Sequence, residues 1–110
     1  MKTRFDILFM DEAWHFILSL DEKVKAKVAY NMERSREVND PEIFKKVGRN
    51  IWEFRTEYAN KQIRLFAFWS PNERALVVCT HGLFKQKQKL PRREIVKAER
   101  MRSNYLGRPY

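Results

Sequence analysis

The spacing of apolar residues changes twice along this chain, and this change restricts the possible folds more than any other feature of the sequence. From Ala13 to Met32, large apolar side chains recur every three or four residues, which is typical of an amphipathic helix. Between residues 51 and 84 they alternate with polar residues or form short continuous runs, as in β-strands. After Pro91 the spacing becomes helical again. Helix, then strands, then helix predicts an α+β fold.

The first part of the chain is expected to hold one strand and one or two helices. Residues 4–10 are predicted to form the strand, and Asp11 is placed to cap the helix that follows. A single helix over 12–38 and an α-hairpin broken near Leu20 both fit the pattern, because Asp21 could begin a second helix.

Three strands are expected after a short basic connection at residues 42–49. Their predicted ranges are 51–58, 62–69 and 75–84. A last helix is expected to start at Pro91, which suits a first helical turn, and to end at Gly107, which suits a C-cap. We therefore predict one domain over 1–110: an antiparallel sheet with its last strand in a central place, and helices on one face, namely an N-terminal helix or α-hairpin and a C-terminal helix.

Positive charge is concentrated in the last quarter of the chain. The sequence has 23 Lys and Arg against 14 Asp and Glu, a formal net charge of +9. Residues 1–84 hold 14 basic and 12 acidic side chains, whereas residues 85–110 hold 9 basic and 2 acidic ones and so carry +7. A concentrated positive field attracts polyanions. Nucleic acid is the favoured partner, ahead of a merely solvated surface or an anionic membrane.

Several classes of protein and of site are disfavoured by the sequence. No run approaches the roughly 18 apolar residues of a membrane span, and the first residues do not resemble a signal peptide. The single cysteine, Cys79, cannot form an internal disulfide, which favours a reducing, cytoplasmic location. His15 and His81 lack metal-ligand spacing, and no Gly-rich phosphate loop is present. We expect no metal, no cofactor and no membrane.

Arg64 is the most informative single residue, because it interrupts an otherwise apolar strand. It shares a strand face with Phe66 and Phe68, where a charge needs a partner or an open site. An ion pair with Glu53 or Glu57 of the preceding strand is one explanation. The other is a guanidinium that the sheet holds rigidly so that its planar fork can grip two phosphate oxygens.

Further cations surround Arg64 in the predicted sheet. Arg55 lies on the strand before that of Arg64, where it alternates with Glu53 and Glu57. It could form ion pairs with them or belong to a binding site. The segment after the last strand is also basic, with Lys85, Lys87, Lys89, Arg92 and Arg93. Its three lysines would share one side if the strand continued. Such a run is usually a solvated surface, and the alternative is a support for a phosphate backbone. His81, which ends the apolar strand, is either a core histidine or a base.

Five segments, taken in order, resemble a known family. They are residues 44–48, 51–55, 62–66, 81–85 and 89–95. Together they resemble the phage-derived, HigB-like branch of the RelE/ParE toxin superfamily, over nearly the whole chain and most strongly from 44 to 106. The family commonly has two adjacent lysines and a Thr-Pro, whereas here Gln86 follows Lys85 and Leu90 precedes Pro91.

The resemblance implies a compact α+β toxin whose sheet carries the active surface. Members of the HigB and RelE type cleave mRNA, generally on the translating ribosome, and are neutralised by a cognate antitoxin that in this branch is usually a helix-turn-helix protein. ParE-type relatives act on DNA gyrase instead. By position, Arg64 matches the strand arginine of the RNase members and Arg55 the arginine of the preceding strand. Lys85 matches the first lysine of the lysine-rich run.

The implied activity is a ribosome-associated endoribonuclease that needs no metal, because the 2′-hydroxyl of RNA can attack the adjacent phosphate. We hypothesise that Arg64 holds that phosphate and Arg55 adds charge. Lys85 or Lys87 would transfer protons, since crowding by other cations favours neutral lysine. Flanking RNA would be bound by Lys89, Arg92 and Arg93. A gyrase inhibitor and a non-catalytic nucleic-acid-binding module are the alternatives.

Overall fold

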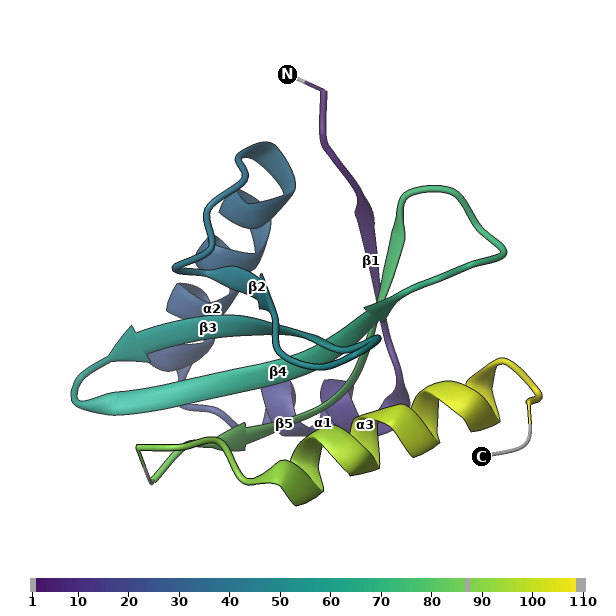
Figure 1. Ribbon diagram of the computed structural model, residues 1–110. Coiled ribbons are helices and arrows are strands. Elements are labelled where there is room, and N and C mark those ends of the chain that lie inside the picture. The colour runs from purple at the N-terminus through teal and green to yellow at the C-terminus, as the bar shows by residue number, and fades with distance from the viewer. Residues whose placement is uncertain (1, 87, 109–110) are drawn as a thin grey trace.

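The computed structural model describes residues 2–86 and 88–108 (Figure 1). Its strands are β1 (Asp6–Phe9), β2 (Phe44–Lys46), β3 (Trp52–Tyr58), β4 (Lys61–Trp69) and β5 (Leu76–Phe84). Its helices are α1 (Asp11–Leu18), α2 (Glu22–Glu37) and α3 (Arg92–Tyr105). The order of these elements confirms the predicted α+β class.

The region after β1 is an α-hairpin, and its break lies where the sequence allowed one. Helix α1 ends at Leu18, and Asp21 occupies the N-cap position of α2, although its side chain makes no capping hydrogen bond. The prediction that Asp11 caps α1 is wrong, because Met10 is the N-cap and Asp11 is the first helical residue. An acidic residue favours the positive end of the helix dipole from either position.

The five strands form one mixed sheet in the order β1-β5-β4-β3-β2. Strands β2 to β5 pair antiparallel, but β1 pairs parallel with β5, so the prediction of a wholly antiparallel sheet is wrong for β1. Parallel pairing requires a long connection, which the intervening helices and strands provide. As predicted, β5 is an inner strand, flanked by β1 and β4.

Strand β2 lies in the segment that we expected to be a connection. It has three residues and pairs antiparallel with β3 at the edge of the sheet. Phe44 is buried, whereas Lys45 and Lys46 are both exposed. Two adjacent lysines hide the alternation by which a strand is recognised, yet lysine is common on edge strands because it discourages pairing with other chains.

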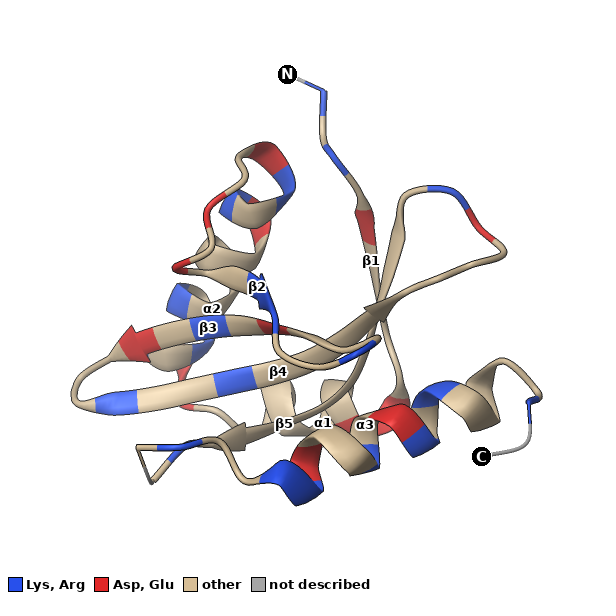
Figure 2. Cartoon of the chain, viewed as in Figure 1, with Lys and Arg blue, Asp and Glu red and all other residues tan. Residues whose placement is uncertain are grey.

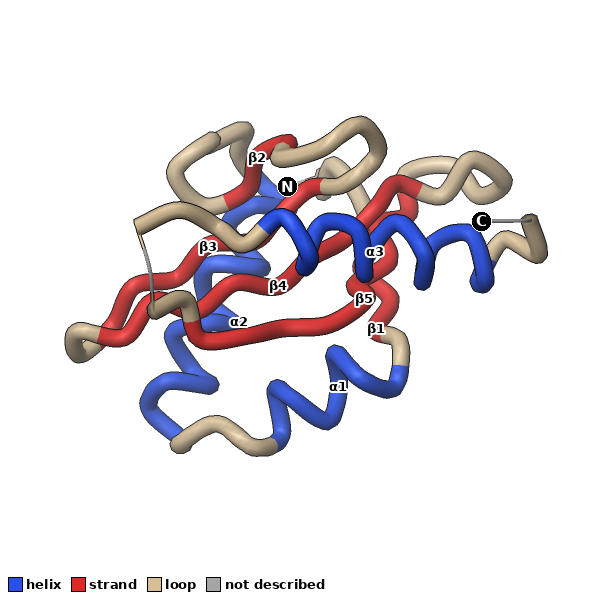
Figure 3. The backbone as a smooth tube through the Cα atoms, turned by 60° about the horizontal axis from the view of Figure 1, so that its bottom comes forward, coloured by secondary structure: helices blue, strands red, loops and turns tan. Residues whose placement is uncertain are grey.

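Helices cover both faces of the sheet, so the prediction that they share one face is wrong (Figure 3). Helix α1 packs on β5 and α2 packs on β3, and the larger core on this side includes Phe54 and Leu65. Helix α3 packs on β4 and β5 from the other side, over a smaller core that includes Phe66 and Ala98. Since side chains alternate along a strand, Arg64 lies on the α3 side.

Candidate nucleic-acid interface

Four cations from neighbouring strands gather on the sheet face that carries α3. Lys45 belongs to β2, Arg55 to β3 and Arg64 to β4, and Lys85 follows β5 directly. Arg55 pairs with Arg64 across the strands, and the backbone N–H of Lys85 donates to the carbonyl of Gln62. Figure 2 shows basic positions on β2, β3 and β4 and in the segment between β5 and α3. Paired residues of adjacent strands share a face, so these side chains converge.

Among the shallow cavities beside these cations, two are lined by an arginine of the sheet. The larger, of about 350 Å³, is lined by Lys45, Lys46, Val47, Glu53, Arg55, Lys85, Gln88, Leu90 and Ile95. The smaller, of about 200 Å³, is lined by Asn31, Glu42, Ile43, Arg55, Thr56, Glu57 and Arg64. Arg55 lines both of them. A polar cavity with several cations can accept the phosphate groups of a nucleic acid.

Arg55 and Arg64 lie at different depths. The Arg64 side chain is 5% exposed, whereas the Arg55 side chain is 28% exposed. Arg64 donates from Nη1 to the carbonyl oxygen of Ile63 and from Nη2 to Oε1 of Gln62, both at 3.1 Å. A guanidinium has five N–H donors, so these bonds fix its orientation without using all of them. Arg55 is therefore the more accessible arginine for a ligand, whereas Arg64 is buried and held by its two hydrogen bonds.

A buried glutamate, Glu53, forms ion pairs with both arginines. Its Oε1 lies 3.4 Å from Nε of Arg55 and 3.7 Å from Nε of Arg64, so of the two glutamates considered from the sequence the structure pairs Glu53 with both arginines. Burial raises the pKa of the Glu53 carboxyl, although both arginines act to lower it. Burial lowers the pKa of Arg64, and Glu53 acts to raise it. At each residue the loss of hydration outweighs the attraction between the charges.

The remaining predicted site residues differ in whether they line these two cavities. Lys85 is half-buried and lines the larger one. The three predicted RNA-binding residues are exposed and line neither cavity; they are Lys89, Arg92 and Arg93. Lys87, predicted as the alternative to Lys85 for proton transfer, lies outside the described residues.

His81 is a core residue and does not reach the cations. It is 1% exposed, and its ring stacks on Phe66 with centroids 4.8 Å apart. Its Nε2 lies 3.1 Å from Oε1 of Glu94. Burial lowers the pKa of His81, and the hydrogen bond that Glu94 accepts from its ring acts to raise it. Of the two explanations given from the sequence, the structure fits the core histidine.

Sequence reasoning missed Lys45 and underrated Glu53. Lys45 lies directly opposite Glu53 in the β2–β3 pairing, and a strand at 44–46 would have placed it there. From the sequence, Glu53 was a possible partner for Arg64 or for Arg55, and not for both at once. The alternation in 51–58 already placed Glu53 and Arg55 on the same face, but it could not show that one carboxylate contacts both arginines.

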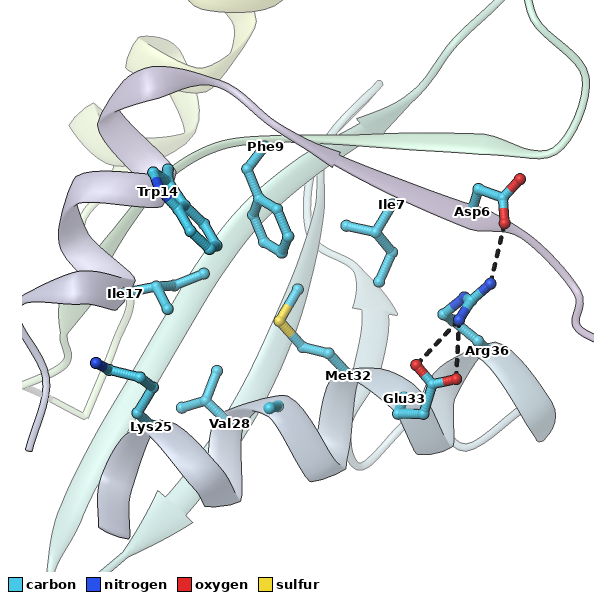
Figure 4. Close-up of a pocket in the computed structure, with 11 residues that line it drawn as sticks. Asp6, Ile7, Phe9, Trp14, Ile17, Lys25, Val28, Met32, Glu33 and Arg36 are labelled. Carbon is cyan, nitrogen blue, oxygen red and sulfur yellow. Dashed lines mark hydrogen bonds and ion pairs between the residues drawn. The ribbon is translucent and has the colours of Figure 1, made fainter. Parts of the chain in front are cut away.

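Another cavity, of about 590 Å³, lies on the opposite side of the sheet, between β1, α1 and α2 (Figure 4). Apolar side chains, including Phe9 and Trp14, form much of its lining. Its arginine, Arg36, is already paired with Asp6 and Glu33. Because its lining is largely apolar and its arginine is already paired, this cavity suits a phosphate group less well than the two cavities lined by Arg55.

Two general expectations concern metals and membranes. Within residues 2–86 and 88–108 there is no group of three or more His, Cys, Asp or Glu side chains that could hold a metal ion. No helix in the same part of the chain is long and apolar enough to cross a bilayer.

Comparison with known proteins agrees with the observed architecture. A family model described as "Phage derived protein Gp49-like (DUF891)" matches residues 15–103. Among matching solved structures, the isolated E. coli RelE toxin aligns with a TM-score of 0.57 at 17% sequence identity, covering 84% of this chain and 96% of that chain. At this identity the likeness establishes a RelE-like α+β fold. No curated protein matches the chain by sequence.

Proposed function

The chain belongs to the phage-derived Gp49-like family, and on that premise we propose that it is the toxin of a type II toxin–antitoxin system. Family and fold confirm the resemblance to the HigB-like branch of the RelE/ParE toxin superfamily. Within that class we propose a cytoplasmic endoribonuclease that cleaves mRNA on the ribosome. Its second partner would be a cognate helix-turn-helix antitoxin.

The observation that supports RNA cleavage is that Arg55, Arg64 and Lys85 lie on one face of the sheet and line two neighbouring cavities. In the proposed reaction the 2′-oxygen bonds to the adjacent phosphorus, and the bond from phosphorus to the 5′-oxygen breaks. The products are a 2′,3′-cyclic phosphate and a 5′-hydroxyl. A base takes the 2′-hydroxyl proton and an acid supplies one to the 5′-oxygen. Fixed cations stabilise the charge that gathers on the phosphoryl oxygens.

The depths of the side chains suggest their roles. Arg55, the more exposed arginine, would contact the phosphate first, and Arg64 would stabilise the same group from below. Lys85 is the candidate for proton transfer among the described residues. Lys87 is proposed for the same role from the sequence alone. The exposed cations would hold flanking RNA, and they are Lys89, Arg92 and Arg93.

The proposal is tested by induced expression in a bacterial host, with growth measured and mRNA 5′ ends mapped. Arg64→Ala is the site variant. Arg74→Ala, in the exposed turn before β5, is the matched control. We expect growth arrest with new cuts in phase with codons, lost in Arg64→Ala and kept in Arg74→Ala. Full toxicity of a normally expressed Arg64→Ala protein would remove Arg64 from the site.

The same experiment separates the alternatives. Arrest with intact mRNA and altered DNA supercoiling would indicate a gyrase inhibitor of the ParE type. The absence of arrest would indicate a nucleic-acid-binding module without catalysis, which salt-sensitive RNA binding by the purified chain would then identify.

A further inference from the structure

Two arginines face each other in the middle of the candidate site. Arg55 on β3 and Arg64 on β4 are direct cross-strand partners. Like charges in this arrangement repel and destabilise a sheet. Since Arg64 is almost fully buried, water screens the repulsion poorly. Some other group must hold these two guanidinium groups together.

Glu53 is placed to hold the two guanidinium groups together, and one of its carboxylate oxygens contacts both of them. Its Oε1 lies 3.4 Å from Nε of Arg55 and 3.7 Å from Nε of Arg64. Its Oε2 and the Nε of Arg55 are buried without a hydrogen-bond partner among the described residues. A carboxylate that served only stability would gain more from a two-pronged pair with one arginine. This shared contact leaves polar atoms unsatisfied, which costs free energy of folding.

The ionised form of Glu53 also weakens the fold. Burial raises its pKa, even though Arg64, Arg55, Lys45 and Lys85 all act to lower it. For a group whose pKa is raised in the folded state, the stabilising contribution is present at low pH and is lost as the pH rises through the folded value. At neutral pH the carboxylate is therefore less favourable in the fold than in the unfolded chain. Stability alone does not account for its presence.

We propose that Glu53 is a positioning residue of the candidate ribonuclease, whose shared oxygen holds the guanidinium groups of Arg55 and Arg64 side by side so that both can bind one phosphate group. This inference rests on the proposed function. Cations that are already aligned stabilise the transition state without rearranging during the reaction. Without Glu53, repulsion between the two arginines would move them apart.

The proposal predicts that Glu53→Gln slows RNA cleavage without weakening RNA binding. Glutamine keeps the shape of the side chain but removes its negative charge from a site that binds an anion. Binding of RNA should therefore stay the same or become tighter. Cleavage should become about 100-fold slower, the size of effect expected when reacting groups are displaced by about 1 Å. A residue with a purely structural role would not produce this split.

The experiment uses the purified whole chain in three assays. The rate of mRNA cleavage on translating ribosomes gives kcat and KM. Affinity is measured for a single-stranded RNA carrying 2′-O-methyl groups, which cannot be cut because it lacks free 2′-hydroxyls. Thermal unfolding reports the fold. The variants are Glu53→Gln, Glu53→Asp and, as a control for the change in net charge, Glu73→Gln in an exposed turn.

We expect Glu53→Gln to lose kcat without losing RNA affinity or thermal stability, Glu53→Asp to recover part of the rate, and Glu73→Gln to match the unmodified chain. A Glu53→Gln rate within about twofold of the unmodified rate would overturn the inference and leave the ribonuclease proposal standing. If Glu53→Gln does not fold, Glu53→Asp decides, and an unchanged kcat in that variant overturns the inference. If the unmodified chain cleaves no mRNA, the proposed function fails and this inference fails with it.

Discussion

The imidazole Nε2 of His81 on β5 lies 3.1 Å from Oε1 of Glu94 on α3. On the other side of the ring, Nδ1 lies 2.9 Å from the hydroxyl oxygen of Thr80. These buried contacts tie the first turn of α3 to the interior of the sheet. Arg92 and Arg93 begin the same helix, so His81 helps to place the basic segment without contacting it.

The His81 contact predicts that the fold loses stability in mild acid. Burial lowers the pKa of His81 below its usual 6.5, so the unfolded chain takes up the proton first. The stability that His81 contributes is complete above 6.5 and is lost as the pH falls. Thermal unfolding from about pH 8 to about pH 5 should show a steeper fall in Tm for the unmodified chain than for His81→Gln. Because Glu12, Glu94 and Lys97 face His81 in the unmodified chain and stay in the variant, equal slopes would contradict the prediction.

Arg55→Ala should weaken RNA binding and make it less sensitive to salt. Arg55 is the more exposed arginine, so its loss removes a direct phosphate contact. Each such contact contributes about 0.7 to the slope of log affinity against log salt for a single strand. Titrations of the 2′-O-methylated RNA at several salt concentrations measure this slope, with Arg74→Ala as the control. A slope equal to that of the unmodified chain would mean that Arg55 does not touch the RNA.

Arg64→Lys should abolish most cleavage while keeping the charge. A lysine has no planar fork, so it cannot bond the Ile63 carbonyl and the Gln62 side chain and still present further donors in the same plane. We expect a rate about 100-fold lower, as for the loss of one preorganised donor to a transition state. Circular dichroism checks that the variant is folded. Full activity would show that a positive charge alone suffices at this position.

Lys85→Arg should separate proton transfer from charge. Arginine stays protonated in proteins, so it can bind phosphate but cannot act as a base. If Lys85 transfers a proton, the variant keeps its RNA affinity and loses about 100-fold or more in kcat. The parallel variant Lys87→Arg tests the other lysine assigned to this role. Unchanged kcat in Lys85→Arg would limit Lys85 to an electrostatic contribution.

The β3–β4 turn offers a stabilising change. Ala59 and Asn60 both have positive φ angles, of 52° and 63°, and an alanine side chain makes this conformation costly. Asn-Gly is the pair that such two-residue hairpins favour. The double variant Ala59→Asn, Asn60→Gly should gain about 1 kcal/mol in chemical denaturation, since alanine leaves the left-handed region. A loss of stability would show that the alanine side chain makes contacts worth more than the strain.

Apolar spacing predicted the helices and β3 by their periods, and β4 and β5 as continuous apolar runs between turns. The parallel pairing of β1 could not be predicted, since spacing shows which face of a strand is buried and not which strand lies next to it. Strand β2 is too short and too basic to show any period. The break between α1 and α2 was one of two alternatives that the sequence left open, because Asp21 could begin a second helix.

For the candidate site, alternation placed Arg55 and Arg64 on the same face of the sheet, and the pairing agrees. Their different exposed fractions, 5% for Arg64 and 28% for Arg55, depend on tertiary packing, which no local pattern records. The sharing of Glu53 between both arginines is likewise a product of the register between β3 and β4.

The pairing of β1 with β5 has a consequence for the order in which the chain folds. Strands β3, β4 and β5 are joined by short turns and can associate early, whereas β1 must find a partner near the other end of the chain. Closing so long a loop costs more chain entropy and slows folding. We therefore expect the meander to form first and the N-terminal strand and α-hairpin to dock last. A nascent chain that has not yet exposed β5 lacks the strand on which α1 mainly packs.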